Sequence, residues 1–389
     1  SEKKGNGNSG VFNQILDHQK PDSFRKEEPE SKVKVVFSYN QAPKKREADD
    51  FVLYFNNRFQ KIAKILRNRQ ELQNITSINR IISKTNKEQV SLIGIVSDKQ
   101  YTKNGNCILT VEDNTGYIKL LVNKNKPDLF RTAKDVVLDE VIGVNGVNGD
   151  NIIFVNTLLF PNIPQKNGIK KAGEEAYALF LSDMHVGSKN FLEKDFNKFL
   201  KWINQELGNE TQKRIASKVK YIFILGDLVD GCGVYPGQEG ELNIKDIKDQ
   251  YRVCAEMLGK VPSHINLIIC PGNHDAMRVA EPQLPIYKDF AGPIYDLPNV
   301  IMVSNPSIIN IHSLHNFPGF DVLVYHGHSF DFYLSGVESI RNLGGYDRVD
   351  LLMKFLLKKR HLAPSYTSTL YVPDTSSDSL VIETIPDFL

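Results

Sequence analysis

The stretch that decides the fold is YIFILGDLVD, residues 221–230. Its first five residues are apolar and rich in aromatic and β-branched side chains, which predicts a strand buried on both faces. The chain then turns polar at once, with Gly226 and the two carboxylates Asp227 and Asp230. An apolar strand that ends in this way is typical of an α/β sheet whose site lies at the carboxyl ends of its strands.

Three further apolar runs end in polar motifs: residues 178–182 lead into LSDMH, residues 265–270 into CPGNHD and residues 322–325 into HGH. Helical patterns separate the first three strands, so these strands are expected to lie parallel in one sheet. Carboxylates, imidazoles and an amide oxygen are all ligands of first-row divalent ions. A DxH motif alone usually reflects a surface ion pair or a cap, but three such motifs in series predict a pair of ions that share a carboxylate.

The pattern along the chain divides it into five parts: a flexible tail at 1–48, a helical segment at 49–87, a barrel at 88–163, a linker at 164–175 and an α/β domain at 176–389. In the helical segment, Phe59, Ile62 and Leu66 fall on one face, and Asp49 or Asp50 is the expected cap. We expect a packing helix whose charged residues are solvated.

Residues 88–163 alternate with a period of two. Five short strands, with a short helix at Pro127–Ala133 between the third and the fourth, are the plan of an OB-fold barrel. Such barrels often bind single strands through aromatic stacking over a basic groove, for which Tyr101, Lys103 and Lys119 are candidates. A scaffold role for the barrel stays equally open.

Composition excludes several classes of protein. Hydrophobic residues make up 41% and charged residues 24% of the 389 positions, as in ordinary globular proteins. Lys and Arg exceed Asp and Glu by only two, so binding of nucleic acid must depend on local patches. No apolar run could span a membrane, and no signal-peptide pattern is present. Four separated cysteines without a CxxC pair predict buried reduced thiols and a cytoplasmic protein.

The order DxH, GDxxD, GNHD and a final His after a strand resembles the calcineurin-like metallophosphoesterase superfamily. The segments DG at 230–231, VYPGQ at 234–238 and RHLAP at 360–364, together with a preceding OB-fold, are similar to small subunits of archaeal family-D DNA polymerases. This resemblance covers residues from about 50 to 389. Eukaryotic relatives have generally lost the ligands that are present here, so the catalytically competent archaeal type is favoured.

The resemblance implies a role for each motif residue. It assigns a first ion to Asp183 and His185, a second to Asn273 and His326, and the bridging position to Asp227. The ions are expected to be manganese, and iron, zinc and magnesium also suit these ligands.

Other residues are expected to support the chemistry. His274 matches the catalytic histidine that serves the leaving 3′ oxygen, and Asp275 is its expected acceptor. His328, Asp230 and Tyr235 are candidates for supporting or substrate-facing positions. We expect Asp230 to fix the loop after Asp227.

The superfamily completes its ligand set with a later GHxH motif, and residues 385–389 precede it. His361 lies in a basic helix end, where a solvated or capping role is favoured, and His328 could substitute as a ligand. We therefore expect residues 1–389 alone to bind metal weakly and to show little or no nuclease activity. Full activity in a manganese-supplemented exonuclease assay would contradict this.

The resemblance implies a 3′-to-5′ exonuclease that proofreads for a large polymerase subunit. The expected partners are that large catalytic subunit and the 3′ end of DNA or single-stranded DNA, with a sliding clamp as a further candidate and no membrane; the protein would be nucleoid-associated. Two alternatives stay open: a non-catalytic assembly subunit, and a phosphomonoesterase of the same superfamily.

Overall fold

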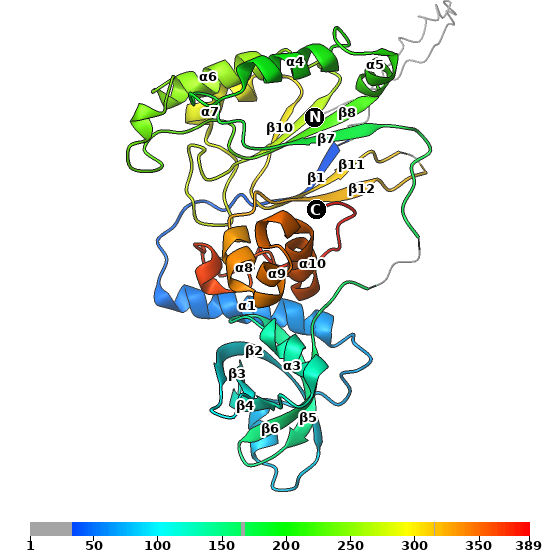
Figure 1. Cartoon of the computed structure of the whole chain (residues 1–389), viewed down its shortest axis with the longest axis vertical. Helices are drawn as coiled ribbons and strands as arrows, with labels where there is room; N and C mark the ends of the chain where they lie inside the picture. The colour runs from blue at the N-terminus through cyan, green and yellow to red at the C-terminus, as the bar shows by residue number, and fades with distance from the viewer. Residues whose placement is uncertain (1–32, 165–167, 315) are drawn as a thin grey trace, which may run out of the picture.

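The computed structural model describes residues 33–164, 168–314 and 316–389. Figure 1 shows a strand barrel at one end of the molecule, two stacked sheets with covering helices at the other, and a layer of helices between them. The described chain therefore combines an all-β part and an α/β part, as the sequence predicted.

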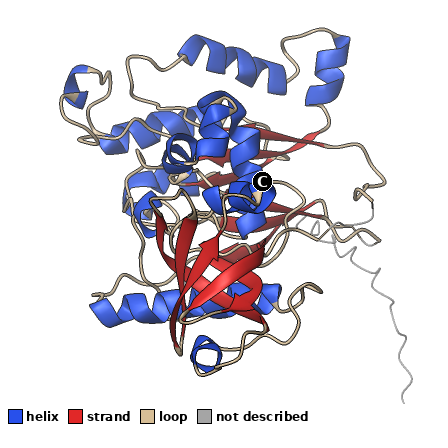
Figure 2. Cartoon of the chain, turned by 60° about the horizontal axis from the view of Figure 1, so that its bottom comes forward, coloured by secondary structure: helices blue, strands red, loops and turns tan. Residues whose placement is uncertain are grey.

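The barrel consists of β2 (Gln89–Tyr101), β3 (Cys107–Asp113), β4 (Gly116–Val122), β5 (Val141–Asn148) and β6 (Ile152–Leu159), with α3 (Pro127–Lys134) between β4 and β5. The strands close in the order β2-β3-β4-β6-β5, and Figure 2 shows them wrapped around a common interior. Inward positions such as Leu109, Leu120 and Ile153 are fully buried. The expected five-stranded OB-fold barrel, with its helix between the third and fourth strands, is confirmed.

Two helices precede the barrel, α1 (Ala48–Leu66) and α2 (Ile78–Ile82). The cap of α1 is Glu47, two or three residues before the expected Asp49 or Asp50. Glu47 and Asp50 form a reciprocal capping box. The predicted apolar face packs on the outside of the barrel through Phe59, Ile62 and Leu66. The opposite face is also buried, because α1 lies between the barrel and the α/β part (Figure 1). The expectation that its charged residues are solvated is wrong for Arg58, which is 0% exposed.

The main sheet contains β7 (Tyr177–Leu181), β8 (Val219–Leu225), β9 (Asn266–Cys270) and β10 (Val300–Met302), parallel in the order β10-β9-β8-β7. Alternate residues of each strand point to opposite faces. Ile222 and Ile224 of β8 face α4 (Glu193–Ile203), α6 (Ile247–Leu258) and α7 (Lys288–Tyr295). Tyr221 and Phe223 face the second sheet. The short helix α5 (Glu210–Ala216) joins α4 to β8.

The second sheet consists of β1 (Val33–Ser38), β11 (Ser307–Ile311) and β12 (Phe320–Val324), in the order β1-β11-β12. Each strand is antiparallel to its neighbour. The expected flexible tail at 1–48 is therefore wrong for residues 33–38, because these residues pair with a strand that comes far later in the chain. Tyr39, which follows, is 3% exposed. Residues 1–32 of the expected tail lie outside the described residues.

The middle layer follows β12 and contains α8 (Phe330–Gly336), α9 (Glu338–Asn342), α10 (Val349–Lys359) and the 3₁₀ turns Gly345–Arg348 and Tyr366–Ser368. Lys359 Nζ donates to Glu140 Oε2 of the barrel at 2.6 Å, and both side chains are buried. This ion pair joins the barrel to the α/β part. No helix of the described residues is long and apolar enough to cross a membrane. Of the four free cysteines, Cys232 is exposed, contrary to expectation.

Candidate metal centre

The motif residues follow the carboxyl ends of neighbouring strands. Asp183 and His185 follow β7, Asp227 follows β8, and Asn273 and His274 follow β9. Because β7, β8 and β9 are adjacent and parallel, these loops meet at one edge of the main sheet. His326 reaches the same place from the end of β12 in the second sheet, where its ring approaches Asn273.

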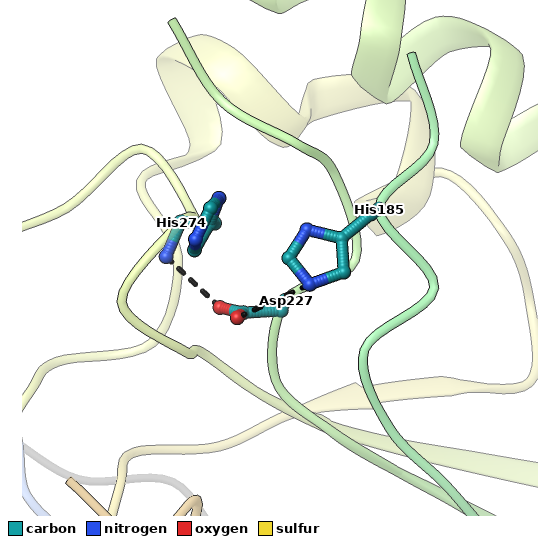
Figure 3. Close-up of side chains that lie close together, drawn as sticks. All are labelled: His185, Asp227 and His274. Carbon is teal, nitrogen blue, oxygen red and sulfur yellow. Dashed lines mark hydrogen bonds and ion pairs between the residues drawn. The ribbon is translucent and has the colours of Figure 1, made fainter. Parts of the chain in front are cut away.

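Two groups of ligand atoms form there among the described residues. One contains His185, Asp227 and His274, which Figure 3 shows turned toward one another, and the other contains Asp183, Asp227 and His326. In each group the atoms lie within 4.8 Å of one another. Two ligand atoms that each lie about 2.0–2.2 Å from an ion are at most about 4.4 Å apart. Each of the two groups could therefore hold one ion after small movements of its side chains. Asp227 belongs to both groups, as a bridging carboxylate must.

The distances place Asp227 between two imidazoles. Its Oδ2 lies 3.6 Å from His185 Nε2 and 3.7 Å from His326 Nε2, and Asn273 Oδ1 lies 3.0 Å from the same nitrogen of His326. Asp183 Oδ1 is 3.8 Å from His185 Nε2. All five residues that the sequence assigned to metal are thus brought together. The donor set, a shared carboxylate with imidazoles and an amide oxygen, suits divalent ions.

Outer contacts orient the two imidazoles. His326 Nδ1 lies 2.7 Å from the backbone carbonyl of Leu225, and because a carbonyl only accepts, Nδ1 carries the hydrogen and Nε2 faces the site with its lone pair. His185 Nδ1 lies 3.1 Å from Asp230 Oδ1, an ion-pair contact without hydrogen-bond alignment, and its Nε2 faces Asp183 and Asp227. Carboxylate and carbonyl partners of this kind are typical of ligating histidines.

The backbone of the site is held in an unusual conformation. Asp183, His185 and Asp227 have φ values of 54°, 50° and 52°, in the left-handed region that disfavours residues with a Cβ. Such strain clusters at functional sites, where the surrounding structure maintains it. Gly272 is required for a different reason: a Cβ at this position would lie 2.1 Å from Asp227 Oδ1. The close approach of this loop to Asp227 therefore depends on a glycine.

The charges of the site are coupled. The neighbouring imidazole of His185, whose Nε2 lies 3.8 Å from the carboxylate, holds the pKa of Asp183 down at about 2, against the cost of burial. The same contact raises the pKa of His185, with further help from Asp227 and Asp230. The cluster thus concentrates negative charge that attracts a proton to His185. A divalent cation would displace that proton, because metal binding needs the neutral imidazole.

The expected acceptor of His274 is wrong. Asp275 does not contact the ring; it accepts hydrogen bonds from Gly272 N at 2.9 Å and from the Tyr251 hydroxyl at 3.0 Å, and burial raises its pKa to about 6. His274 Nδ1 instead lies 2.7 Å from the backbone carbonyl of Asp230. Asp275 therefore fixes the turn after β9, and Asp230 orients the imidazole.

Sequence reasoning missed Gln238, which is 1% exposed in the 3₁₀ turn Gln238–Gly240. Its Nε2 donates to the carbonyl and to the carboxylate of Asp230, at 2.8 and 3.0 Å. The sequence feature that could have identified Gln238 is its position at the end of the VYPGQ segment. Tyr235 of that segment lies with its ring centroid 6.3 Å from that of His274. Asp230 is thus held as an outer support for His185 and His274.

Two other histidines lie outside the ligand groups. The ring of His328 packs edge-on against that of His326 at 5.3 Å, and burial lowers its pKa to about 4. Its ring therefore packs beside His326 without joining either ligand group. The expected solvated or capping role of His361 is wrong: its side chain is 1% exposed, and Nε2 lies 2.9 Å from Asp378 Oδ2.

Two known families match parts of this chain. Residues 178–389 match the family of B subunits of DNA polymerases alpha and epsilon, and residues 90–147 match the OB-fold nucleic acid binding domain. The chain is 38% identical to the DNA polymerase II small subunit of Methanothermobacter thermautotrophicus, over 88% of this chain and 68% of that protein. It is 40% identical to the small subunit of Pyrococcus abyssi, over 86% of this chain and 52% of the relative.

The chain belongs to the family of archaeal DNA polymerase II small subunits. The small subunit of Methanocaldococcus jannaschii is 39% identical over 88% of this chain and 56% of its own length. The chain thus spans between about half and two thirds of the length of these relatives. The resemblance inferred from the motifs, to small subunits of archaeal family-D polymerases, is confirmed.

Proposed function

We propose that this chain carries the nuclease centre of a polymerase small subunit, a two-metal 3′-to-5′ exonuclease of the metallophosphoesterase type that proofreads for the large catalytic subunit. The observation that carries the proposal is the pair of ligand groups that share Asp227. Two ions about 3.5–4 Å apart, bridged by one carboxylate, are a recurring arrangement for hydrolysis of phosphate esters. The family relationship supports the choice of DNA as the substrate.

The residues divide between the two ions as follows. By the family resemblance, Asp183 and His185 would hold one ion, Asn273 and His326 the other, and Asp227 both. The ligand groups divide differently, because Asp183 lies with His326 and His274 lies with His185, so ion binding would have to move His274 out of its group. Manganese suits this mixture of oxygen and nitrogen donors well, and iron, zinc or magnesium fit it to differing degrees. When bound, the ions supply positive charge for two phosphate oxygens and lower the pKa of a bound water.

The chain's own groups handle protons and position. Because the carbonyl of Asp230 only accepts, His274 donates from Nδ1, and Nε2 is the nitrogen left to act on the substrate. In its protonated form, this nitrogen would give a proton to the leaving 3′ oxygen. Asp230 and Gln238 keep the imidazole in place during that transfer.

The proposal includes a scaffold role. The large catalytic subunit is the expected partner, since the relatives are named as small subunits of DNA polymerase II. The buried pair Lys359–Glu140 fixes the barrel to the α/β part, so a partner that contacts both would meet one rigid surface. DNA is the expected second partner, through its 3′ end.

The test uses the natural protein that contains residues 1–389, assembled with its large subunit. We expect manganese-dependent release of mononucleotides from a primer with a 3′ mismatch, and loss of this release to below detection in Asp227→Ala. Asp289→Asn, which removes an exposed carboxylate at the start of α7, is the matched control and should keep full activity. Isothermal titration with Mn²⁺ should show binding that Asp227→Ala abolishes.

Each alternative gives a different result. If the large subunit assembles with this protein and no ester is hydrolysed, with or without Mn²⁺, the result would favour the non-catalytic assembly role and refute the nuclease. Release of phosphate from a small monoester without attack on DNA would favour the phosphomonoesterase.

A further inference from the structure

A cavity of about 630 Å³ opens directly beside the ligand groups. Asp183, His185 and His274 form one of its walls, and Phe191, Phe196 and other residues of the loop and helix after β7 form another. Its volume lies within the range of about 300–1,000 Å³ that is usual for pockets that hold one small ligand. The cavity therefore connects the site of hydrolysis with an apolar surface.

The apolar wall is a row of aromatic rings. The centroids of Phe191 and Phe196 are 6.2 Å apart, and those of Phe196 and Phe199 are 5.6 Å apart. All three rings are half-buried, because they also pack against the core beneath α4, which includes Leu200. Rings that are fixed in this way lose little further freedom when a flat group stacks on them. The wall is thus suited to a planar ligand.

The charged residues of the remaining lining are acidic, and they stand beside the neutral Ser182, Ser188 and Asn190. Glu241 accepts a hydrogen bond from the Tyr235 hydroxyl at 2.8 Å, and Asp195 stands at the start of α4. None of the described residues that line the cavity is Lys or Arg; Lys198 pairs with Asp195 but is not part of the lining. Away from the ions, a phosphate would meet carboxylates and no cation. Amino groups of a base, in contrast, can donate to these oxygens.

We propose that this cavity holds the base and sugar of the 3′-terminal nucleotide, with Phe196 as a stacking surface. The inference rests on the proposed nuclease function and adds to it the part of the substrate that the site recognises. A cavity that excludes a second phosphate takes only the last nucleotide, so the phosphate at the ions is the one on its 5′ side.

The reaction that follows from this position releases one nucleotide. Water supplies the oxygen that bonds to phosphorus, the bond from phosphorus to the preceding 3′ oxygen breaks, and that oxygen takes up a proton. The products are a nucleoside 5′-monophosphate and a strand that is one nucleotide shorter. A base in the cavity has left the duplex stack, and leaving costs least for a mismatched base. The cavity thus gives a physical reason for preferring mismatched ends.

The first test compares two DNA ends on the natural protein with Mn²⁺: a normal 3′-terminal nucleotide, and a terminal tetrahydrofuran that lacks the base. Stacking of one base is worth about 1–3 kcal/mol, so we expect kcat/KM to favour the normal end about 5- to 150-fold. Phe196→Ala should lose most of this preference, and Phe196→Leu should keep the fold but still lack the ring. Phe180→Ala, which removes a half-exposed ring of β7 outside the cavity, should keep the preference.

The second test needs no hydrolysis. Saturation-transfer NMR on residues 1–389 without added metal should show contact from the protein to the adenine protons of 2′-deoxyadenosine, which carries no phosphate that the carboxylates would repel. The signal should be lost in Phe196→Ala and kept in Phe180→Ala.

The outcomes separate the two proposals. Equal cleavage of both ends by the unmodified protein, or a full preference in Phe196→Ala, would overturn the cavity assignment. So would an unchanged 2′-deoxyadenosine signal in that variant. Absence of any cleavage together with Phe196-dependent binding of 2′-deoxyadenosine would refute the nuclease function and leave the cavity as a nucleoside-binding site.

Discussion

Replacing Arg58 by methionine tests how α1 is fixed to the end of the chain. Arg58 Nε donates to Asp378 Oδ2 at 2.8 Å, and both side chains are 0% exposed. A second nitrogen of the guanidinium, NH1, donates to the carbonyl of Pro364 at 2.6 Å. Methionine keeps most of the apolar volume but leaves the carboxylate of Asp378 buried without its main cation. A broken buried pair of this kind costs about 3–5 kcal/mol of the free energy of unfolding.

The electrostatics of Asp378 predict a pH dependence. Burial alone would raise its pKa, but the contacts with His361 and Arg58 outweigh burial and hold the pKa far below its usual value. Burial lowers the pKa of His361 to about 4, so Arg58 is the cation that faces Asp378 at pH 7. The carboxylate is therefore ionised at pH 7 in the unmodified protein. Its contribution to stability is complete above the ordinary pKa near 3.8 and is lost progressively as the pH falls below that value. Without Arg58 the pKa rises, so protonation relieves the penalty earlier. The loss caused by Arg58→Met should thus be larger at pH 7 than at pH 5.

The measurement is urea unfolding at 25 °C, followed by circular dichroism, for Arg58→Met, Asp378→Asn and the double variant. We expect the double variant to lose at least about 1 kcal/mol less than the two single variants together, because neither charge is then left alone. The control is Arg252→Met, which breaks an exposed contact with Glu256 and should leave the midpoint unchanged. Additive losses, or a loss in Arg58→Met no larger than in the control, would refute the reasoning.

Three further predictions follow from buried or crowded positions. Burial raises the pKa of Glu281 to about 8, so the contribution of Glu281 to stability is complete below the ordinary pKa near 4.5 and is lost as the pH rises toward 8. The free energy of unfolding should therefore fall by up to ~1.4 kcal/mol per pH unit between pH 5 and 8 in urea titrations, and Glu281→Gln should remove this fall. Gly272→Ala places a Cβ against Asp227 and should weaken Mn²⁺ binding about 10- to 100-fold by calorimetry, while the circular dichroism spectrum stays unchanged. Lys359→Met leaves Glu140 buried without its partner and should lower the free energy of unfolding by about 3–5 kcal/mol in urea. If the double variant Lys359→Met, Glu140→Gln is no more stable than Lys359→Met alone, this reasoning is wrong.

Local signals were sufficient to predict that the motifs after β7, β8 and β9 meet at the candidate metal centre. Each motif follows directly on an apolar strand, and adjacent parallel strands bring such motifs to one edge whatever lies between them. The barrel was equally accessible, because its alternation of apolar residues and its turn residues lie within one continuous segment. In both cases the residues that form the deciding pattern lie close together in the sequence.

Contacts between distant segments could not be predicted. The strand at 33–38 stands in a polar stretch and gains its role only through pairing with β11. Arg58 follows the charge pattern of a solvated helix face, and its burial depends on Asp378, some 320 positions later. His361 shares that partner. The same limit explains the error at His274: adjacency suggested Asp275, whereas the turn directs the imidazole to the carbonyl of Asp230.

The pairing of the first described strand has a consequence for how the protein is made. Val33 and its neighbour Ile311 are separated by about 280 positions, so the ribosome adds the missing strand roughly 14–56 s after the first one has been synthesised. The whole barrel has been synthesised well before then, while the backbone of VKVVFS is still without its partner strand. A waiting apolar strand invites association with other chains, and Lys34 interrupts this one with a charge. Synthesis rate and nascent-chain chaperones should therefore affect the yield of this protein more than the stability of its barrel would suggest.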